Sequence, residues 1–241
     1  MIVRNLALLA SDTARTKAYI QEMIHNDLIP EICVVYSDDL KKLEDECLNY
    51  KKNVEESLYF DIKEPLLWTL NRNKVSYVTV DDKDINSEKM ATCIEKLSQQ
   101  YLVYSGYGGY ILQKHLFHMG KKFIHVHAGI LPQYRGSTTI YYSYLERKQF
   151  GATAIFLSEG IDEGEILSQK EFGLPDEPVN IDYIYEPYLR AQVLLDVVRK
   201  IADGCELGGS RQNSQNANTY FIIHPVLKHL ALLGIEAEEK R

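Results

Sequence analysis

The sequence predicts an α/β fold in which helices cover both faces of a doubly wound, mostly parallel sheet. Two observations predict it. Short apolar runs of strand length alternate with longer segments of helical periodicity over the first half of the chain. In addition, 45% of the 241 residues are hydrophobic, a usual fraction for a globular protein that buries a core. Alternation of this kind is typical of parallel strands joined by helical crossovers.

The first half of the chain supplies the repeating strand and helix units. Apolar runs predict strands at residues 2–9, 32–36, 75–80, 101–104 and 123–127. Apolar residues at helical spacing predict helices at residues 14–24, 38–64, 86–98 and 110–118. The helix expected at 38–64 is rich in Lys and Glu, which is typical of a solvated amphipathic helix. This order indicates a Rossmann-like sheet.

The second half of the chain continues the pattern and then changes character. It predicts helices at residues 137–148 and 180–202, strands at 152–157 and 166–172, and a short strand at 220–223 before a short helix and a charged tail. Gly204 closes the long helix, and residues 208–218 are rich in Gly, Ser, Asn and Gln, which favours a loop. We therefore expect a core domain at residues 1–204 and a small C-terminal extension at 205–241.

Charge and cysteine content narrow the class of protein. The formal net charge of −7 and the sequence pI near 5.5 argue against a large nucleic-acid face, which needs clustered Lys and Arg. The four cysteines form no paired motif, as expected for reduced thiols in a reducing compartment. The N-terminus lacks the pattern of a signal peptide, and no stretch approaches the roughly 18 apolar residues that span a membrane. We expect a cytoplasmic protein without nucleic-acid or membrane partners.

The residues that carry chemistry gather where the fifth expected strand ends. Ligands of doubly wound sheets bind beyond the carboxyl ends of the strands, which places Gly106 and the residues after Val126 at the site. His125 and His127 are two residues apart, so both side chains emerge on one face of the strand. Such a pair can close a strand as polar residues, share a metal ion, or act as an acid–base and oxyanion pair. The spacing alone leaves all three interpretations open.

Three motifs surround this histidine pair. His125-Val-His127 runs into Ile130-Leu-Pro132-Gln-Tyr134-Arg135-Gly136, the segment Glu159-Gly160-Ile161-Asp162-Glu-Gly164 precedes an expected strand, and Ser105-Gly106-Tyr107-Gly-Gly leads into Ile111-Leu112. The motifs resemble those of the folate-dependent formyltransferases, in which an Asn-x-His strand end runs into a Leu-Leu-Pro-x-Tyr-Arg-Gly turn. In that family an Asp also lies between glycines ahead of a strand. The resemblance covers residues 101–172 well and the flanks more loosely.

This resemblance implies a reaction and its catalytic residues. It implies transfer of a formyl group from 10-formyltetrahydrofolate to a primary amine through a tetrahedral intermediate that carries an oxyanion. His127 would be the central catalytic residue, with Asp162 holding it and helping to take up the proton of the amine. A preorganised oxyanion donor is worth about 3 kcal/mol of barrier. No metal ion is implied.

His125 departs from the family pattern, because the family has Asn at this position. A neutral imidazole donates one hydrogen bond, and an imidazolium donates on both sides. The oxyanion-binding role can therefore persist with a different pH dependence, or the site can bind ligands without turnover. We expect catalysis to be retained.

The resemblance also assigns residues to the two substrates. It implies donor-binding residues at Tyr104, Gly106, Tyr107, Glu159, Gly160 and Ile161, and acceptor-binding residues at Pro132, Tyr134, Arg135, Gly136 and Tyr220. Arg135 is suited to a phosphate or carboxylate, and Tyr220 to stacking on a base or sugar. The same residues are also compatible with turn and packing roles alone.

Features outside the motifs bear on the amine acceptor. The segment after the first strand, which begins at Ala10, lacks the Gly-rich phosphate loop of the purine-pathway relatives. Few residues follow Gly204, whereas the initiator-tRNA relatives carry a large C-terminal nucleic-acid-binding domain. What remains resembles the sugar N-formyltransferases, so we expect a UDP- or dTDP-linked amino-dideoxy sugar as the acceptor. A carrier-bound amino acid and methionyl-tRNA are the nearer alternatives.

Other function classes stay open. His125, His127 and Asp162 are also compatible with a metal-dependent hydrolase or deacetylase, and the exchange at position 125 with a non-catalytic folate or nucleotide-sugar binding module. A hydrolase that deformylates the folate is a nearer alternative. Because several sugar-modifying relatives are dimers, the resemblance favours a homodimer.

Overall fold

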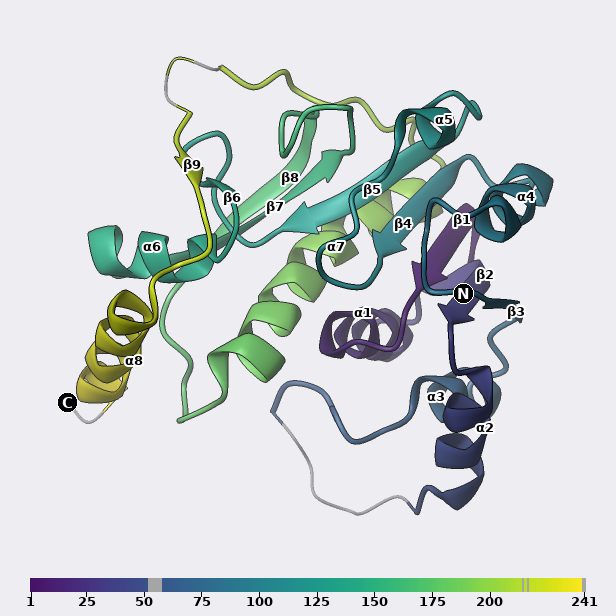
Figure 1. Ribbon diagram of the computed structural model, residues 1–241, viewed down its shortest axis with the longest axis horizontal. Coiled ribbons are helices and arrows are strands. Elements are labelled where there is room, and N and C mark those ends of the chain that lie inside the picture. The colour runs from purple at the N-terminus through teal and green to yellow at the C-terminus, as the bar shows by residue number, and fades with distance from the viewer. Residues whose placement is uncertain (52–57, 214, 216, 240–241) are drawn as a thin grey trace.

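The central element of the fold is a seven-stranded sheet with the strand order β3-β2-β1-β4-β5-β7-β8 (Figure 1). The computed structural model describes residues 1–51, 58–213, 215 and 217–239. The strands are β1 (Ile2–Ala10), β2 (Ile29–Ser37), β3 (Tyr77–Asp81), β4 (Tyr101–Ser105), β5 (Lys122–His127), β7 (Phe150–Phe156) and β8 (Ile166–Phe172). β1 to β5 are parallel to one another, and β7 runs antiparallel to both of its neighbours, β5 and β8. The predicted α/β class and mostly parallel sheet are confirmed.

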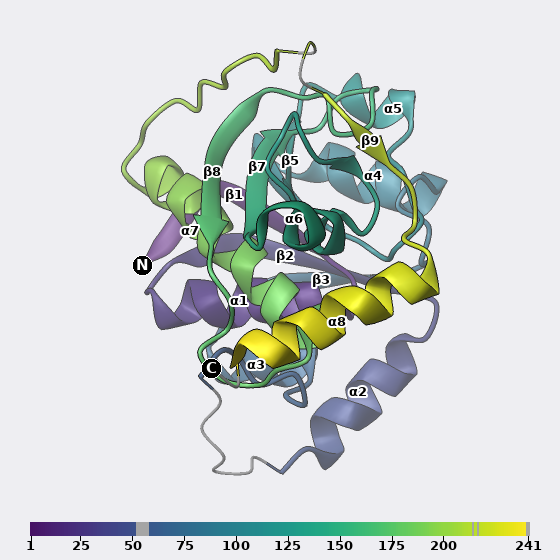
Figure 2. The same cartoon turned by 90° about the vertical axis from the view of Figure 1, so that its left-hand side faces the viewer.

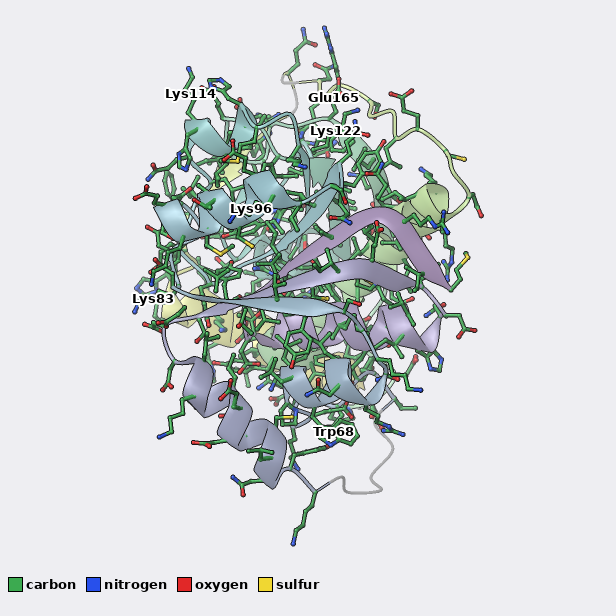
Figure 3. All side chains as sticks on the ribbon, turned by 90° about the vertical axis from the view of Figure 1, so that its right-hand side faces the viewer. Trp68, Lys83, Lys96, Lys114, Lys122 and Glu165 are labelled. Carbon is green, nitrogen blue, oxygen red and sulfur yellow. The ribbon has the colours of Figure 1, made fainter. Side chains whose placement is uncertain are left out.

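Helices cover both faces of this sheet. α1 (Ala14–His25), α3 (Leu66–Arg72) and α7 (Glu186–Ala202) pack on one face, and α4 (Glu88–Lys96) and α5 (Lys114–Phe117) pack on the other. Side chains of a strand alternate between the faces, so Leu6 and Leu8 face α1 and α7, whereas Ala7 and Leu9 face α4. Lysines such as Lys96 and Lys114 lie on the outer surface of this second layer (Figure 3).

A third apolar cluster joins the C-terminal elements to the core. α6 (Thr139–Arg147), the π-helical turn η1 (Ile181–Tyr185) and α8 (Pro225–Glu239) contribute to it, and α8 lies across α6 (Figure 2). A separate two-stranded sheet pairs β6 (Arg135–Gly136) with β9 (Thr219–Tyr220). The C-terminal segment therefore contacts the motif around Arg135 directly.

Several predicted elements have different bounds in the structure. The single helix expected at 38–64 is shorter in the structure, where α2 covers only Leu40–Asn49. Residues 52–57 of the expected helix lie outside the described part, and the next helix, α3, begins after Pro65. The strand predicted at 220–223 is the shorter β9, which ends at Tyr220. The charged residues expected as a tail belong to α8 as far as Glu239, and Ala231 and Ile235 of this helix are buried. No helix among the described residues is both long enough and apolar enough to cross a bilayer.

The helix expected at 110–118 is reduced to α5 because a side chain competes for its backbone. Asn86 Oδ1 accepts a hydrogen bond from the Gln113 backbone N–H at 2.7 Å, and Asn86 Nδ2 donates to the Ile111 carbonyl at 2.9 Å. Backbone groups satisfied in this way do not enter a helical ladder. Residues 110–112 instead form the wall of a cavity at the carboxyl end of the sheet.

Candidate functional site

The site lies where β4 and β5 separate at the carboxyl end of the sheet. Their ladder ends at the Val103–Ile124 pair, while β5 continues along β7 as far as the His127–Thr153 pair. His125 and His127 therefore lie on a strand end that is paired on one side only. Strands that separate in this way open the crevice in which doubly wound sheets bind ligands.

His127 is buried and contacts three groups. Its Nε2 lies 2.6 Å from the carbonyl oxygen of Tyr134 and 3.2 Å from the hydroxyl of Thr139, and its Nδ1 lies 3.4 Å from Asp162 Oδ2. A carbonyl only accepts hydrogen bonds, so Nε2 carries the hydrogen in this arrangement. Nδ1 is therefore the nitrogen that gains or loses a proton, and it faces a carboxylate.

Asp162 is held in place by its backbone and by the turn that follows His127. Its φ of 53° lies in the left-handed region, which Asp and Asn tolerate better than most residues. The backbone N–H of Gly136 donates to Asp162 Oδ2 at 2.9 Å. Gly136 itself has a φ of +98°, and a Cβ there would lie 2.1 Å from the Tyr220 carbonyl oxygen. The close β6–β9 contact therefore needs glycine at the position that orients Asp162.

Burial and the carboxylate of Asp162 shift the pKa of His127 in opposite directions. Burial lowers the pKa of His127 because an enclosed site disfavours the imidazolium, and the nearby Arg190 charge adds to this effect. The carboxylate of Asp162 raises the same pKa. The resulting pKa is lowered, so the resting imidazole is neutral, and Asp162 provides the stabilisation that a proton arriving at Nδ1 requires.

His125 has a buried ring nitrogen, Nδ1, without a hydrogen-bond partner. Its ring lies beside Tyr104, with ring centroids 6.2 Å apart. Burial, followed by the charges of Arg15 and Arg190, holds the pKa of His125 well below its ordinary value. His125 is therefore neutral, and of its two predicted protonation states the imidazolium is the disfavoured one.

The lowered pKa of His125 predicts how acid affects stability. Below the unfolded-state pKa of about 6.5, the unfolded chain binds a proton at this residue that the folded chain refuses. Its contribution to stability is thus present above that pH and is lost as the pH falls. We expect His125→Asn to lose less unfolding free energy than the wild type between about pH 7.5 and about pH 5.5, measured by urea denaturation. Equal losses would contradict the assignment.

A cavity of about 140 Å³ is lined by His125 and Asp162, and His127 lies outside its lining. Its wall includes six of the predicted site residues, namely Tyr104, His125, Glu159, Gly160, Ile161 and Asp162, together with the apolar Ile111, Leu112, Phe117 and Leu157. Gly106 and Tyr107 do not line it. The Gly106 carbonyl accepts a hydrogen bond from Arg15, and Tyr107 donates to the Tyr36 carbonyl at 3.4 Å. The structure thus gathers most of the predicted donor site and places these two behind it.

The predicted acceptor residues lie outside the cavity lining and contact the His127–Asp162 pair through Tyr134 and Gly136. Tyr134 and Tyr220 stack with ring centroids 5.4 Å apart, and both hydroxyls donate to Glu146. Arg135 donates to Gln212 Oε1 at 2.8 Å and to Glu163 Oε1 at 3.1 Å, so its guanidinium is occupied by protein acceptors. Pro132 belongs to a loop fastened by Gln169, whose amide donates to the Leu131 carbonyl at 2.9 Å.

Sequence reasoning missed three polar residues of the site. Thr139 contacts His127 from the first turn of α6, Arg15 reaches the end of β4 from α1, and Arg190 reaches the end of β5 from α7. Arg190 has a signal in the sequence, because it lies between the apolar Leu189 and Ala191 within a helix expected to be buried. In the described part of the chain, no three His, Cys, Asp or Glu side chains converge as metal ligands.

Comparisons with known proteins identify relatives of this chain. The chain is 27% identical over 177 residues to a methionyl-tRNA formyltransferase of Finegoldia magna. The aligned region covers 68% of this chain and 56% of that protein. The chain thus spans about half the length of this curated relative, and less of others that it matches.

Solved structures that share the fold include two formyltransferases. One is an N-formyltransferase from Helicobacter canadensis in complex with folinic acid and dTDP-3-aminofucose. Its TM-score is 0.57 at 15% identity, and the alignment covers 92% of this chain and 71% of that one. A 4-N formyltransferase from Francisella tularensis has a TM-score of 0.58 at 14% identity and covers 95% of this chain and 87% of its own. The sequence model of the family described as formyl transferase matches residues 4–177, which include most of β1, all of β2 to β8, the histidine pair and Asp162. The chain therefore belongs to the formyl transferase family.

Proposed function

We propose that this chain is an N-formyltransferase that moves the formyl group of 10-formyltetrahydrofolate to the primary amine of a nucleotide-linked amino-dideoxy sugar. One observation carries the proposal. A buried His127–Asp162 pair adjoins a cavity that Asp162 and His125 line, and Nδ1 of His125 has no hydrogen-bond partner. This arrangement provides a proton acceptor, a charge that stabilises it and a polar group free for a ligand, as formyl transfer to an amine requires.

The cavity fits the donor by its mixed lining. Leu112, Phe117 and Leu157 supply apolar surface, and His125 and Asp162 supply polar groups at one end, as in sites that hold a flat heteroaromatic ligand in one orientation. When bound, 10-formyltetrahydrofolate would supply the activated formyl group. The relatives with solved structures include one in complex with folinic acid, which supports a folate donor here.

His127 and Asp162 are suited to the proton transfers of the reaction. The amine has to lose one proton as it forms its new bond to the formyl carbon, and the nitrogen from which the formyl group departs has to gain one. His127 Nδ1 is the site for this proton, since Nε2 already carries a hydrogen bonded to Tyr134. Asp162 stabilises the resulting imidazolium, and His127 then returns the proton to the departing nitrogen, so that protons balance. His125 would face the oxygen of the formyl group.

Two observations support a nucleotide-sugar acceptor. The Helicobacter canadensis enzyme was crystallised with dTDP-3-aminofucose. In this chain, Tyr220 packs against Tyr134 and Tyr142 close to β6, which provides an aromatic surface for a base or sugar. Methionyl-tRNA is the second candidate, because the curated relatives carry that activity in their names. The net charge of −7 favours the sugar over a polyanion.

Charge at the rim of the cavity provides a test of the donor site. Ile161 lines the cavity, yet 60% of it is exposed, so Ile161→Asp should fold. The new carboxylate would repel the glutamate tail of a reduced folate, and we expect it to weaken binding of 5-formyltetrahydrofolate by about tenfold, or about 1.4 kcal/mol. Isothermal titration calorimetry measures this binding.

The control is Leu48→Asp, since Leu48 is 82% exposed on α2 and distant from the cavity lining. We expect this variant to bind the folate as the wild type does. Equal weakening in the two variants would assign the effect to net charge alone. A wild-type protein that binds no reduced folate would contradict the donor site.

A further inference from the structure

Arg190 joins α7 to the peptide between the two site histidines. Its Nη1 donates a hydrogen bond to the Val126 carbonyl at 2.9 Å. Its Nη2 pairs with the carboxylate of Glu186, one helical turn earlier, and the Arg190 side chain is only 14% exposed. One guanidinium therefore binds a fixed carboxylate with one nitrogen and the strand end with another.

The Val126 carbonyl needs a donor from outside the sheet. The β4–β5 ladder ends at Val103 and Ile124, two residues before Val126. A carbonyl beyond the last pair has lost its partner strand, and a buried carbonyl without a donor is costly. Arg190 supplies this donor where the strands separate. The crevice can therefore open next to the histidines without leaving the strand end unsupported.

We propose that Arg190 is a positioning residue for the reaction: by holding the Val126 carbonyl, it fixes the separation and orientation of His125 and His127. This inference rests on the proposed function of the two histidines. Val126 is the single residue between them, so a shift of its peptide moves both side chains. Reacting groups tolerate little displacement, since about 1 Å of misplacement can lower a rate about 100-fold.

The charges around this contact explain why the position suits arginine. His125 faces Arg15 of α1, Tyr104 of β4 and His127 of β5 in addition to Arg190, and the two arginines lower its pKa. Arg190 itself faces Glu186, Tyr19 of α1 and Asp162. Glu186 fixes the guanidinium and balances its charge. Lysine carries the charge on a single nitrogen, so it cannot bind the carbonyl and the carboxylate with the same fixed geometry.

Substitutions on one helix separate positioning from general stability. We expect Arg190→Met to lower kcat about 100-fold with KM for the folate donor changed less than about threefold. Arg190→Lys should recover part of this loss. The matched control is Arg199→Met, because Arg199 lies on the same helix, contacts Asn26 and Asp196, and is 49% exposed. It should keep wild-type kcat.

A second readout does not depend on turnover. The imidazole ¹⁵N resonances of His125 and His127 report their hydrogen bonds and protonation, and we expect both to shift in Arg190→Met and to stay unchanged in Arg199→Met. The inference is overturned if a folded Arg190→Met protein keeps wild-type imidazole resonances. If Arg190→Met does not fold, Arg190→Lys carries the test, and wild-type kcat and resonances in that variant overturn the inference. A wild-type protein without transfer activity would instead refute the proposed function. In that case the imidazole resonances of His125 and His127 would still test whether Arg190 positions them.

Discussion

Replacing Asp162 with asparagine is expected to lower the rate of formyl transfer by about 10³-fold while the protein remains folded. Among the groups that raise the pKa of His127 against the effect of burial, the carboxylate of Asp162 has the largest effect. Without its charge, a proton arriving at His127 Nδ1 loses the carboxylate that faces that nitrogen in a buried site. The barrier should therefore rise in the step that removes the proton from the amine.

The Asp162→Asn substitution tests the charge alone, because asparagine preserves the local structure. It tolerates the left-handed φ of 53° at this position, and its side-chain oxygen can accept the Gly136 backbone N–H as Asp162 does. The matched control is Asp27→Asn, since Asp27 has a φ of 58° and lies exposed after α1. Transfer is measured by the rate of product formation. An Asp162→Asn rate within tenfold of the wild type would remove Asp162 from the proposed catalytic role.

His125 is expected to show a large difference between two substitutions. His125→Ala should lower kcat by about 10²-fold or more, because it removes the imidazole that the proposed function assigns as donor to the oxygen of the formyl group. His125→Asn should stay within about tenfold of the wild type, since an amide N–H can donate as a neutral imidazole does. Steady-state kinetics of the two variants measure the difference. Equal rates for the Ala and Asn variants would show that position 125 donates no hydrogen bond in the reaction.

The core of the fold was predictable because its signals are local. Apolar runs such as the one that begins at Ile2 mark the strands, and Gly204 follows the end of α7. The period of two that governs side chains on a strand was sufficient to place His125 and His127 on one face. The turn and the Asp162 loop were found through their resemblance to a family, and the structure brings Asp162 and His127 to 3.4 Å.

The missed features depend on contacts between distant segments. β6 is only two residues long, and its partner strand β9 lies more than eighty residues later in the sequence. Arg190 meets Val126 across 64 residues, so no local pattern links them. The expected helix at 110–118 failed for a similar reason, since Asn86, which binds the backbone of this segment, belongs to an earlier part of the chain. Periodicity cannot register such competition.

The most direct test of the proposed function is mass spectrometry of candidate acceptors incubated with the protein and 10-formyltetrahydrofolate. A panel of UDP- and dTDP-linked amino sugars and methionyl-tRNA serves as acceptors, with the Asp162→Asn variant as the control. The proposal predicts one added formyl group on an amino sugar, with far less product from the variant. Formate released without any formylated acceptor, or formyl transfer to methionyl-tRNA with every sugar unchanged, would contradict it.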